Sequence, residues 1–364
     1  MSKIFEVDSK FWNGKKVFIT GHTGFKGAWA TIWLHRLGAK VFGYSLPSPT
    51  SPSLYESAKI SDLLSGEKLD NICNNESLLK SMIEFQPEIV LHMAAQPLVR
   101  YSYDYPVETY MTNVMGTVFV LESVRKIESI KAALVITTDK CYENFEIQDG
   151  YSEEDRMGGY DPYSSSKGCA ELVVAAWRRS FFGVNGKSIA TARAGNVIGG
   201  GDWALDRLVP DFIRHFSENR RVSIRSPNAI RPWQHVLEPL SGYFKLLEKL
   251  YLEGTPFAES WNFGPLEKDA RDVKFIAERL VSIWGDGASW DLDKQQHQPH
   301  EAKYLKLSIT KAIKKLGWQP TLDIDEALNM TCQWYKKFYL NKDDSYQLCI
   351  EQITSFEEKK NHEV

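Results

Sequence analysis

Two short segments of this sequence carry side chains that can move protons. An apolar, β-branched run ends in Thr138, Asp139 and Lys140, so that a hydroxyl, a carboxyl and an amine follow one another at the end of a predicted strand. Tyr163 and Lys167 are four positions apart, and this spacing places both on one face of a helix. We therefore predict that these five residues form one catalytic centre.

The chemistry that this set favours is oxidation of an alcohol. A lysine one helical turn from a tyrosine stabilises the phenolate and lowers the tyrosine pKa from its usual value of about 10. Such a tyrosine can take the proton of an alcohol while a nicotinamide accepts hydride from the same carbon. Thr138 is placed to hydrogen-bond the same oxygen. This interpretation requires a dinucleotide-binding site elsewhere in the chain.

The first part of the chain supplies such a site. A predicted strand at residues 16–20 is followed by Gly21, Gly24 and Gly27 and then by a helical pattern. A glycine turn between a strand and a helix lets a pyrophosphate approach the helix N-terminus and lets the helix pack close to the strand. The predicted cofactor-binding residues are Gly21, His22, Thr23, Gly24, Phe25, Lys26, Gly27, Asn71, Ala94, Ala95, Tyr163 and Lys167.

The second predicted strand, 40–44, identifies the cofactor only in part. No Asp or Glu ends it to hold the adenosine ribose, and no basic residue stands there for the 2'-phosphate of NADP. NAD is therefore favoured as the cofactor. Asn71 lies within another short predicted strand, 68–72, where it either hydrogen-bonds the adenine or simply forms a turn.

Strands and helices alternate through the first half of the chain, which predicts a doubly wound parallel sheet of the Rossmann type with a smaller mixed α/β lobe. We expect a NAD-binding domain at 1–190 and a nucleotide-sugar lobe mainly at 191–340, with strands near 222–225 and 261–263 belonging to either one. Residues 341–364 are rich in charge and predict a partly disordered tail.

Composition excludes several classes of protein. The net charge of -3 and the absence of a long basic run argue against nucleic acid or an anionic membrane as partner. No apolar run has the length of a signal peptide core or a membrane span, so we expect a cytoplasmic protein. Five cysteines at unrelated spacings predict reduced thiols, and no spacing of histidines and carboxylates predicts a metal site.

The glycine turn, Thr138 and the Tyr163/Lys167 pair, in this order and spacing, resemble the extended short-chain dehydrogenase/reductases that act on nucleotide sugars. Within that family the segments 193–203 and 231–236 are similar to the hexose 4,6-dehydratases, which carry Thr-Asp-Glu where this chain has Thr138, Asp139 and Lys140. The resemblance covers roughly residues 14 to 335. It implies a CDP-linked glucose as substrate, deoxysugar supply for surface polysaccharide such as O-antigen, and a homodimer formed through helices near 107–126 and 163–182.

The resemblance also implies a reaction cycle. Tyr163 removes the proton of the C4 hydroxyl as that carbon is oxidised, Asp139 protonates the leaving 6-hydroxyl, and Lys140 removes the C5 proton. At their usual pKa values Asp139 is ionised and Lys140 is protonated, which is the wrong state for both roles. Transfer of one proton from Lys140 to Asp139 corrects both, and burial favours this uncharged pair. Alternatively, Lys140 only orients the sugar or a water molecule that acts as the base.

Substrate-binding residues are predicted from charge and from the resemblance. Arg231 is the first candidate for a forked contact with the diphosphate, and Arg207 is the second, with a surface ion pair as its alternative role. Asn196 matches the family position that holds the diphosphate-linked sugar, and Gln96 and His300 complete the predicted set.

Two other functions use the same residues. A nucleotide-sugar 4-epimerase needs Tyr163 and Lys167 but has no use for Asp139 and Lys140 as acid and base. A non-catalytic nicotinamide sensor needs only the fold, and it predicts that Tyr163→Phe keeps full activity in cells.

Overall fold

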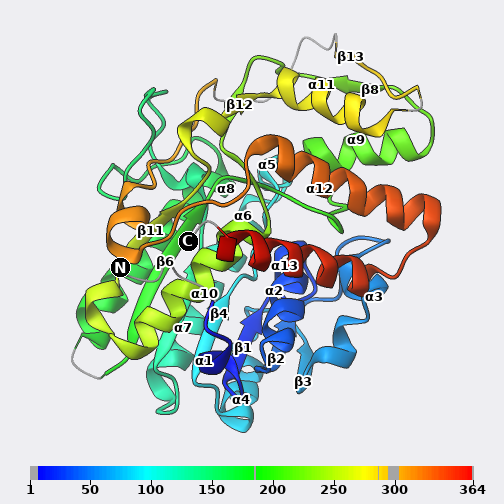
Figure 1. Cartoon of the computed structure of the whole chain (residues 1–364). Coiled ribbons are helices and arrows are strands. Elements are labelled where there is room, and N and C mark those ends of the chain that lie inside the picture. Colours follow the sequence, from blue (N-terminus) through cyan, green and yellow to red (C-terminus); the bar gives the residue numbers. More distant parts are fainter. Residues whose placement is uncertain (1–6, 184–185, 286, 294–302, 363–364) are drawn as a thin grey trace.

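The computed structural model describes residues 7–183, 186–285, 287–293 and 303–362. Its centre is a seven-stranded sheet in the order β11-β6-β5-β4-β1-β2-β3, in which every pair of neighbours is parallel (Figure 1). The strands are β1 (Lys16–Thr20), β2 (Lys40–Ser45), β3 (Gly66–Leu69), β4 (Ile89–His92), β5 (Ala132–Ile136), β6 (Ser188–Ala194) and β11 (Ser260–Phe263). The predicted doubly wound sheet is confirmed, and its order reverses between β1 and β4, where such sheets bind ligands.

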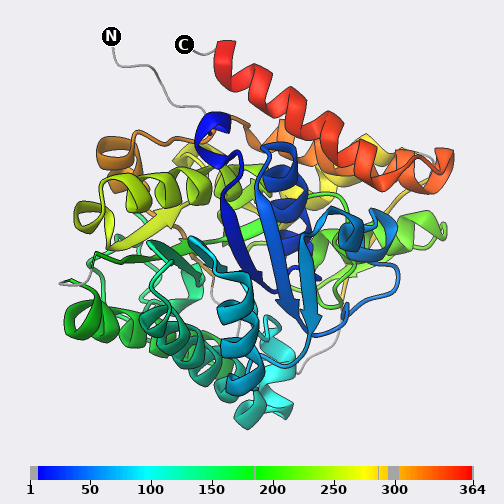
Figure 2. The same cartoon turned by 90° about the horizontal axis from the view of Figure 1, so that it is seen from below.

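Helices cover both faces of this sheet (Figure 2). The α-helices are α1 (Ser9–Trp12), α2 (Phe25–Arg36), α3 (Leu54–Ser57), α4 (Asn75–Phe85), α5 (Val99–Asp104), α6 (Pro106–Tyr110), α7 (Gly116–Lys126), α8 (Pro162–Trp177), α9 (Leu208–Ser217), α10 (Leu237–Leu252), α11 (Val273–Trp284), α12 (Ile324–Lys336) and α13 (Ser345–His362). Single π-helical turns join α6 to α7 (η2, Met111–Met115) and extend α8 (η4, Arg178–Phe182).

Alternation along each strand divides the core into two layers. Phe18 of β1 packs in one cluster with Leu121 of α7 and Val174 of α8. Its neighbour Ile19 packs in the other cluster with Trp29 of α2. Because successive side chains of a strand point to opposite faces, an apolar run such as 16–20 needs helices on both sides.

The second half of the chain builds three small pairs of strands and also returns to the main sheet. The pairs are β7 (Asn196–Ile198) with β10 (Trp233–His235), β8 (Val222–Ile224) with β13 (Trp290–Leu292), and β9 (Ile230–Arg231) with β12 (Arg271–Asp272). The strand expected near 261–263 is β11, at the edge of the main sheet beside β6. The strand expected near 222–225 is β8, which pairs with β13 and not with the main sheet.

The expected charged tail at 341–364 is wrong for residues 345–362. They form helix α13, shown in red in Figure 1, whose residues Leu348, Cys349, Ile353 and Phe356 are buried. Phe356 meets Trp33 of α2 edge to face, with ring centroids 5.8 Å apart. Its apolar face packs on α2, which outweighs the charge of the exposed face.

Candidate active site

The glycine turn has the geometry that a dinucleotide requires. Gly21 has φ +82°, and a Cβ there would lie 2.7 Å from the amide nitrogen of Ala94. A Cβ on Gly27 would lie 2.1 Å from the carbonyl oxygen of Gly21, so only glycine lets α2 start this close to β1. Gly24 is the N-cap residue of α2. The turn, the helix N-terminus and the close backbone approach therefore fit a pyrophosphate.

The polar residues of the turn are tied to the neighbouring strands. His22 is fully buried, and a Cβ on Gly43 of β2 would lie 2.6 Å from its ring. Its Nε2 is 3.0 Å from Oε2 of Glu67, but burial lowers the pKa of His22 below its usual value despite this carboxylate. The Thr23 hydroxyl is 2.8 Å from the Ser45 hydroxyl at the end of β2. These contacts hold the turn against β2 and β3.

Asn71 takes the turn role. Its Oδ1 accepts the Cys73 amide hydrogen bond at 2.9 Å, and its carbonyl accepts the Tyr44 hydroxyl at 3.2 Å. This is an Asx turn after β3. A contact between Asn71 and adenine stays a prediction.

The loop after β4 passes beside the glycine turn at Ala94, and a contact of Ala94 and Ala95 with the cofactor stays a prediction. The Thr20 hydroxyl accepts the Ala94 amide hydrogen bond at 3.1 Å. Gln96 has a role that we did not predict: its Nε2 donates to the Leu98 carbonyl at 3.1 Å and to the Thr109 hydroxyl at 2.9 Å. Both amide hydrogens are thus used to order this loop, and a substrate contact of Gln96 stays a prediction.

The end of β5 places Thr138 and Asp139 inside the protein. Both are buried, with exposed fractions of 7% and 2%, and Lys140 is half-buried. Oδ1 of Asp139 accepts the Thr138 hydroxyl at 3.0 Å, whereas its buried Oδ2 has no partner among the described residues. Burial raises the pKa of Asp139, although Lys140, Thr138 and Arg231 act in the opposite direction. A carboxyl in this environment is suited to act as an acid.

Helix α8 brings Tyr163 and Lys167 to the same strand end. Tyr163 hydrogen-bonds Thr138, and Nζ of Lys167 donates to the Ile136 carbonyl at 3.2 Å. Asp161 caps the helix by accepting the Ser164 amide hydrogen bond at 2.9 Å. The predicted convergence of Thr138, Tyr163 and Lys167 is therefore seen in the structure.

The expected pKa of the tyrosine is wrong in direction. Burial raises the pKa of Tyr163 to about 12, because the loss of water outweighs the Thr138 hydrogen bond. Burial also lowers the pKa of Lys167 to about 8, so this lysine is still mostly charged at pH 7 and loses its charge just above neutral pH. Removal of water penalises the charged form of both groups.

The predicted substrate residues lie at different places around this centre. Nη1 of Arg207 is 2.8 Å from Oδ2 of Asp202, which is the ion pair that we named as its alternative role. Arg231 is buried in β9 and its charge acts on Asp139. Asn196 begins β7, in register with Trp233 of β10. His300 lies outside the described residues.

A family model described as GDP-mannose 4,6 dehydratase matches residues 18–331. The chain belongs to the GDP-mannose 4,6-dehydratase family. It is 55% identical over 342 residues to the CDP-glucose 4,6-dehydratase of Salmonella typhimurium (strain LT2), covering 93% of this chain and 95% of that protein.

Solved structures share the fold of this dehydratase-family chain. A dTDP-glucose 4,6-dehydratase from Bacillus anthracis in complex with NAD has a TM-score of 0.73 and 21% identity, covering 89% of this chain and 97% of that chain. A UDP-glucose 4-epimerase from Thermotoga maritima with UDP-glucose has a TM-score of 0.76 and 21% identity, covering 88% and 99%. At this identity the two structures support the fold alone.

Sequence reasoning missed one residue of this dehydratase-family site, Glu171, and the surroundings of another, Lys26. Lys26 was predicted only as part of the glycine turn, but its side chain interacts electrostatically with Lys167, Arg207, Asp139 and Asp202. Glu171 was not predicted at all, although its position four residues after Lys167 places it on the same helix face. That spacing was the available signal for Glu171, whereas nothing in the sequence indicates the surroundings of Lys26.

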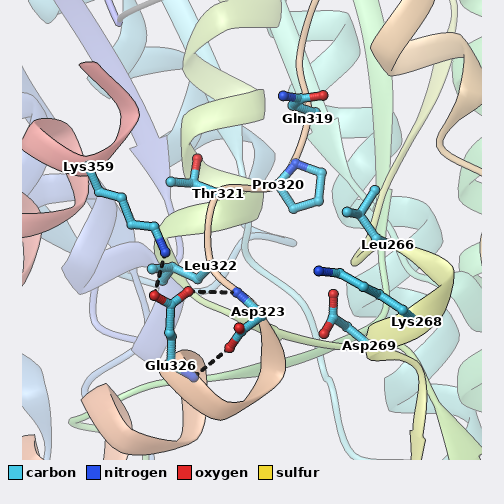
Figure 3. Close-up of a pocket in the computed structure, with 10 residues that line it drawn as sticks. All are labelled: Leu266, Lys268, Asp269, Gln319, Pro320, Thr321, Leu322, Asp323, Glu326 and Lys359. Atoms are coloured by element: carbon cyan, nitrogen blue, oxygen red, sulfur yellow. Dashed lines mark hydrogen bonds and ion pairs between the residues drawn. The ribbon is translucent and has the colours of Figure 1, made fainter. Parts of the chain in front are cut away.

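One cavity of about 450 Å³ lies apart from the predicted site (Figure 3). It is lined by Leu266, Lys268, Asp269, Gln319, Pro320, Thr321, Leu322, Asp323, Glu326 and Lys359, none of which is a predicted site residue. In Figure 3 Glu326 points to Lys359 and to Asp323, with which it forms the capping box of α12. The polar groups of Asp323 and Glu326 in this cavity therefore stabilise the N-terminus of α12.

Within the described ranges, no group of three or more His, Cys, Asp or Glu side chains is arranged to hold a metal ion.

Proposed function

We propose that this chain is an NAD-dependent CDP-glucose 4,6-dehydratase, which converts CDP-glucose to CDP-4-keto-6-deoxyglucose and water. The observation that carries the proposal is the 55% identity to the CDP-glucose 4,6-dehydratase of Salmonella typhimurium over 93% of this chain. The site supports it independently, because a candidate acid, Asp139, and a candidate base, Lys140, follow Thr138 at the end of β5. An epimerase would have no use for that pair.

The glycine cradle fits NAD, since a Cβ at Gly21 or Gly27 would collide with backbone atoms of Ala94 or Gly21 and the N-terminus of α2 could not lie this close to β1. When bound, NAD supplies hydride acceptance from C4 and hydride return to C6. Tyr163 acts as the phenolate, the form that Lys167 favours, and becomes the phenol when it takes the proton of the C4 hydroxyl, to which Thr138 hydrogen-bonds. The raised pKa of Tyr163 means that this phenolate needs a positive neighbour to form near neutral pH.

Elimination of water is assigned to the second pair. Asp139 gives its proton to the 6-hydroxyl as it leaves, and Lys140 takes the C5 proton, which the C4 ketone has made acidic. The raised pKa of Asp139 supports a protonated starting state. Each turnover thus moves one proton to Lys140 and one from Asp139, and the pair is restored by transfer of one proton between them.

The direct test offers the protein NAD and, in separate reactions, CDP-, dTDP-, UDP- and GDP-linked glucose. We expect a 4-keto-6-deoxy product from CDP-glucose, which mass spectrometry detects as the loss of one water molecule from the substrate. An unchanged mass with inversion at C4 would instead identify a 4-epimerase. Lys140→Met should still form reduced nicotinamide but should no longer exchange solvent deuterium into C5. Undiminished exchange would remove Lys140 from the role of base.

We also infer a homodimer formed through α6, η2, α8 and η4. Large apolar side chains are exposed there, namely Val107, Tyr110, Met111, Leu172 and Phe181. Such clusters on a soluble domain mark association surfaces. Light scattering should give twice the mass of one chain, and Leu172→Glu should shift it to one chain.

Location is a separate matter. Within the described residues, no helix combines the length and the apolar character needed to cross a bilayer. Cytoplasmic location and a role in surface polysaccharide synthesis remain predictions.

A further inference from the structure

A buried carboxylate links the two halves of the candidate active site. Glu171 lies in α8 one turn after Lys167, and the side chains of Glu171 and Arg193 are each only 3% exposed. Its Oε1 accepts the Thr137 hydroxyl at 2.5 Å and Nε of Arg193 at 3.0 Å. Its Oε2 accepts Nη2 of Arg193 at 2.8 Å and the Thr191 hydroxyl at 2.7 Å. Both oxygens are thus fully engaged.

The contacts of Arg193 extend this hydrogen-bond network to residues next to the site. Its Nη1 donates to the Tyr142 hydroxyl at 2.6 Å, and that hydroxyl donates to Oδ1 of Asn262 at 2.7 Å. Tyr142 follows the short helical turn η3 (Asp139–Cys141), and Asn262 belongs to β11. Arg193 therefore connects the turn that carries Asp139 to β11 through the Tyr142 hydroxyl.

Position makes Glu171 more than a core ion pair. Thr137, its partner at 2.5 Å, immediately precedes Thr138, Asp139 and Lys140. Glu171 itself is carried by the helix that presents Tyr163 and Lys167. The side chain of Glu171 thus joins the end of β5 to α8 through its hydrogen bond with Thr137. A buried ion pair is weak evidence for stability by itself, because apolar packing often does as well.

Charge gives Glu171 a second effect. Burial raises the pKa of Glu171, but Arg193 and the hydrogen bonds outweigh it and hold the pKa below its usual range, so the carboxylate stays ionised. The groups that interact electrostatically with Lys167 are Glu171 on its own helix, Cys141 on η3, Lys26 on α2 and His92 on β4. Among these, Glu171 is the ionised anion, and it opposes the loss of charge from the buried amine.

We propose that Glu171, held by Arg193, is a positioning residue that fixes the Thr138–Lys140 segment against α8 and supplies the counter-charge of Lys167. The inference deepens the proposed dehydratase function, because it assigns one residue to both the redox and the elimination steps. Glu171 touches no reacting atom. It acts through Thr137 on the elimination residues and through its charge on Lys167.

The positional effect is tested with two matched threonine variants. Thr137→Val and Thr191→Val each remove one hydroxyl that donates to Glu171, but only Thr137 adjoins the strand end. In Thr137→Val we expect deuterium exchange at C5 to slow about ten- to a hundredfold, while formation of reduced nicotinamide changes less. Thr191→Val should stay within about threefold of the parent in both steps. Equal losses of C5 exchange in the two variants would overturn the positional role.

The charge effect is tested without any substrate. In Glu171→Gln the anion is lost and Arg193 is left uncompensated, so both changes lower the pKa of Lys167. We expect an NMR titration of the Lys167 side chain to move by at least about one pH unit to lower pH, with no such movement in Thr137→Val. An unmoved titration in a folded Glu171→Gln protein would overturn this role.

Failure of the proposed function can be told apart from failure of this inference. If the parent protein forms no 4-keto-6-deoxy sugar from CDP-glucose, the proposed function fails, but the Lys167 titration still decides the charge effect. If Glu171→Gln does not fold, Thr137→Val and Thr191→Val still decide the positional effect, since both keep the ion pair.

Discussion

Lys26 places a charge where the folded protein disfavours it. Burial lowers the pKa of this amine from 10.5 to about 7, the cations Lys167 and Arg207 lower it further, and Asp139 and Asp202 oppose the change. Lys26 also lies in the first turn of α2, where the helix dipole repels a cation. We therefore predict that Lys26→Met stabilises the protein when no nucleotide is added.

The sign and size of this effect follow from linkage. Between pH 7 and 10.5 the unfolded chain binds the Lys26 proton more tightly than the folded chain, so the penalty is fully present below about pH 7 and disappears toward pH 10.5. The full shift corresponds to about 5 kcal/mol. Because the side chain is only partly buried and water screens it, we expect a gain of about 2 kcal/mol at pH 7.

Urea unfolding of the parent, Lys26→Met and Lys26→Arg at pH 7 and pH 10 measures this effect. Lys26→Met should be more stable than the parent at pH 7, and the difference should shrink at pH 10 as the parent amine loses its proton. Lys26→Arg is the matched control, because arginine keeps its charge at both pH values. A parent protein as stable as Lys26→Met at pH 7, or a difference that does not change with pH, would refute the reasoning.

Two further predictions concern the cofactor turn and the last helix. Gly27→Ala should weaken NAD binding at least about tenfold, since its Cβ would lie 2.1 Å from the Gly21 carbonyl oxygen and the turn must move; fluorescence titration with NAD measures this, and an unchanged Kd would contradict it. Phe356→Ala should lower the free energy of unfolding by about 3 to 5 kcal/mol because the ring is buried against Trp33. The exposed Glu358→Ala serves as its control and should stay within about 0.5 kcal/mol of the parent.

Local patterns were enough to predict the sheet and the meeting of the catalytic residues. Strand–turn–helix order located the glycine turn. Thr138 and Tyr163 could be expected to meet because, in a doubly wound sheet, the helix that follows a strand begins near the carboxyl edge of the sheet. Helix α13 escaped prediction because Leu348, Cys349, Ile353 and Phe356 are spread among charged residues over 345–362, so the average composition hides one apolar face.

Side-chain environments were the part that sequence could not supply. The raised pKa of Tyr163, the surroundings of Lys26 and the use of Gln96 within its loop all depend on how the folded chain packs around these residues. Thr109, for example, takes one amide hydrogen of Gln96 although it lies on α6. Residue type and spacing give the possible chemistry of a group, but burial and partners decide its protonation state.

Two buried carboxyl groups close to the same strand end make this last point concrete. Glu171 accepts hydrogen bonds on both oxygens and pairs with Arg193, and its pKa is held below the usual range. Asp139 accepts the Thr138 hydroxyl on Oδ1 but has an Oδ2 without a partner among the described residues, and burial raises its pKa. Environments that push two acids apart in this way assign their roles. We therefore propose Glu171 as the carboxylate that stays ionised and positions the site, and Asp139 as the carboxyl that gives a proton to the leaving hydroxyl.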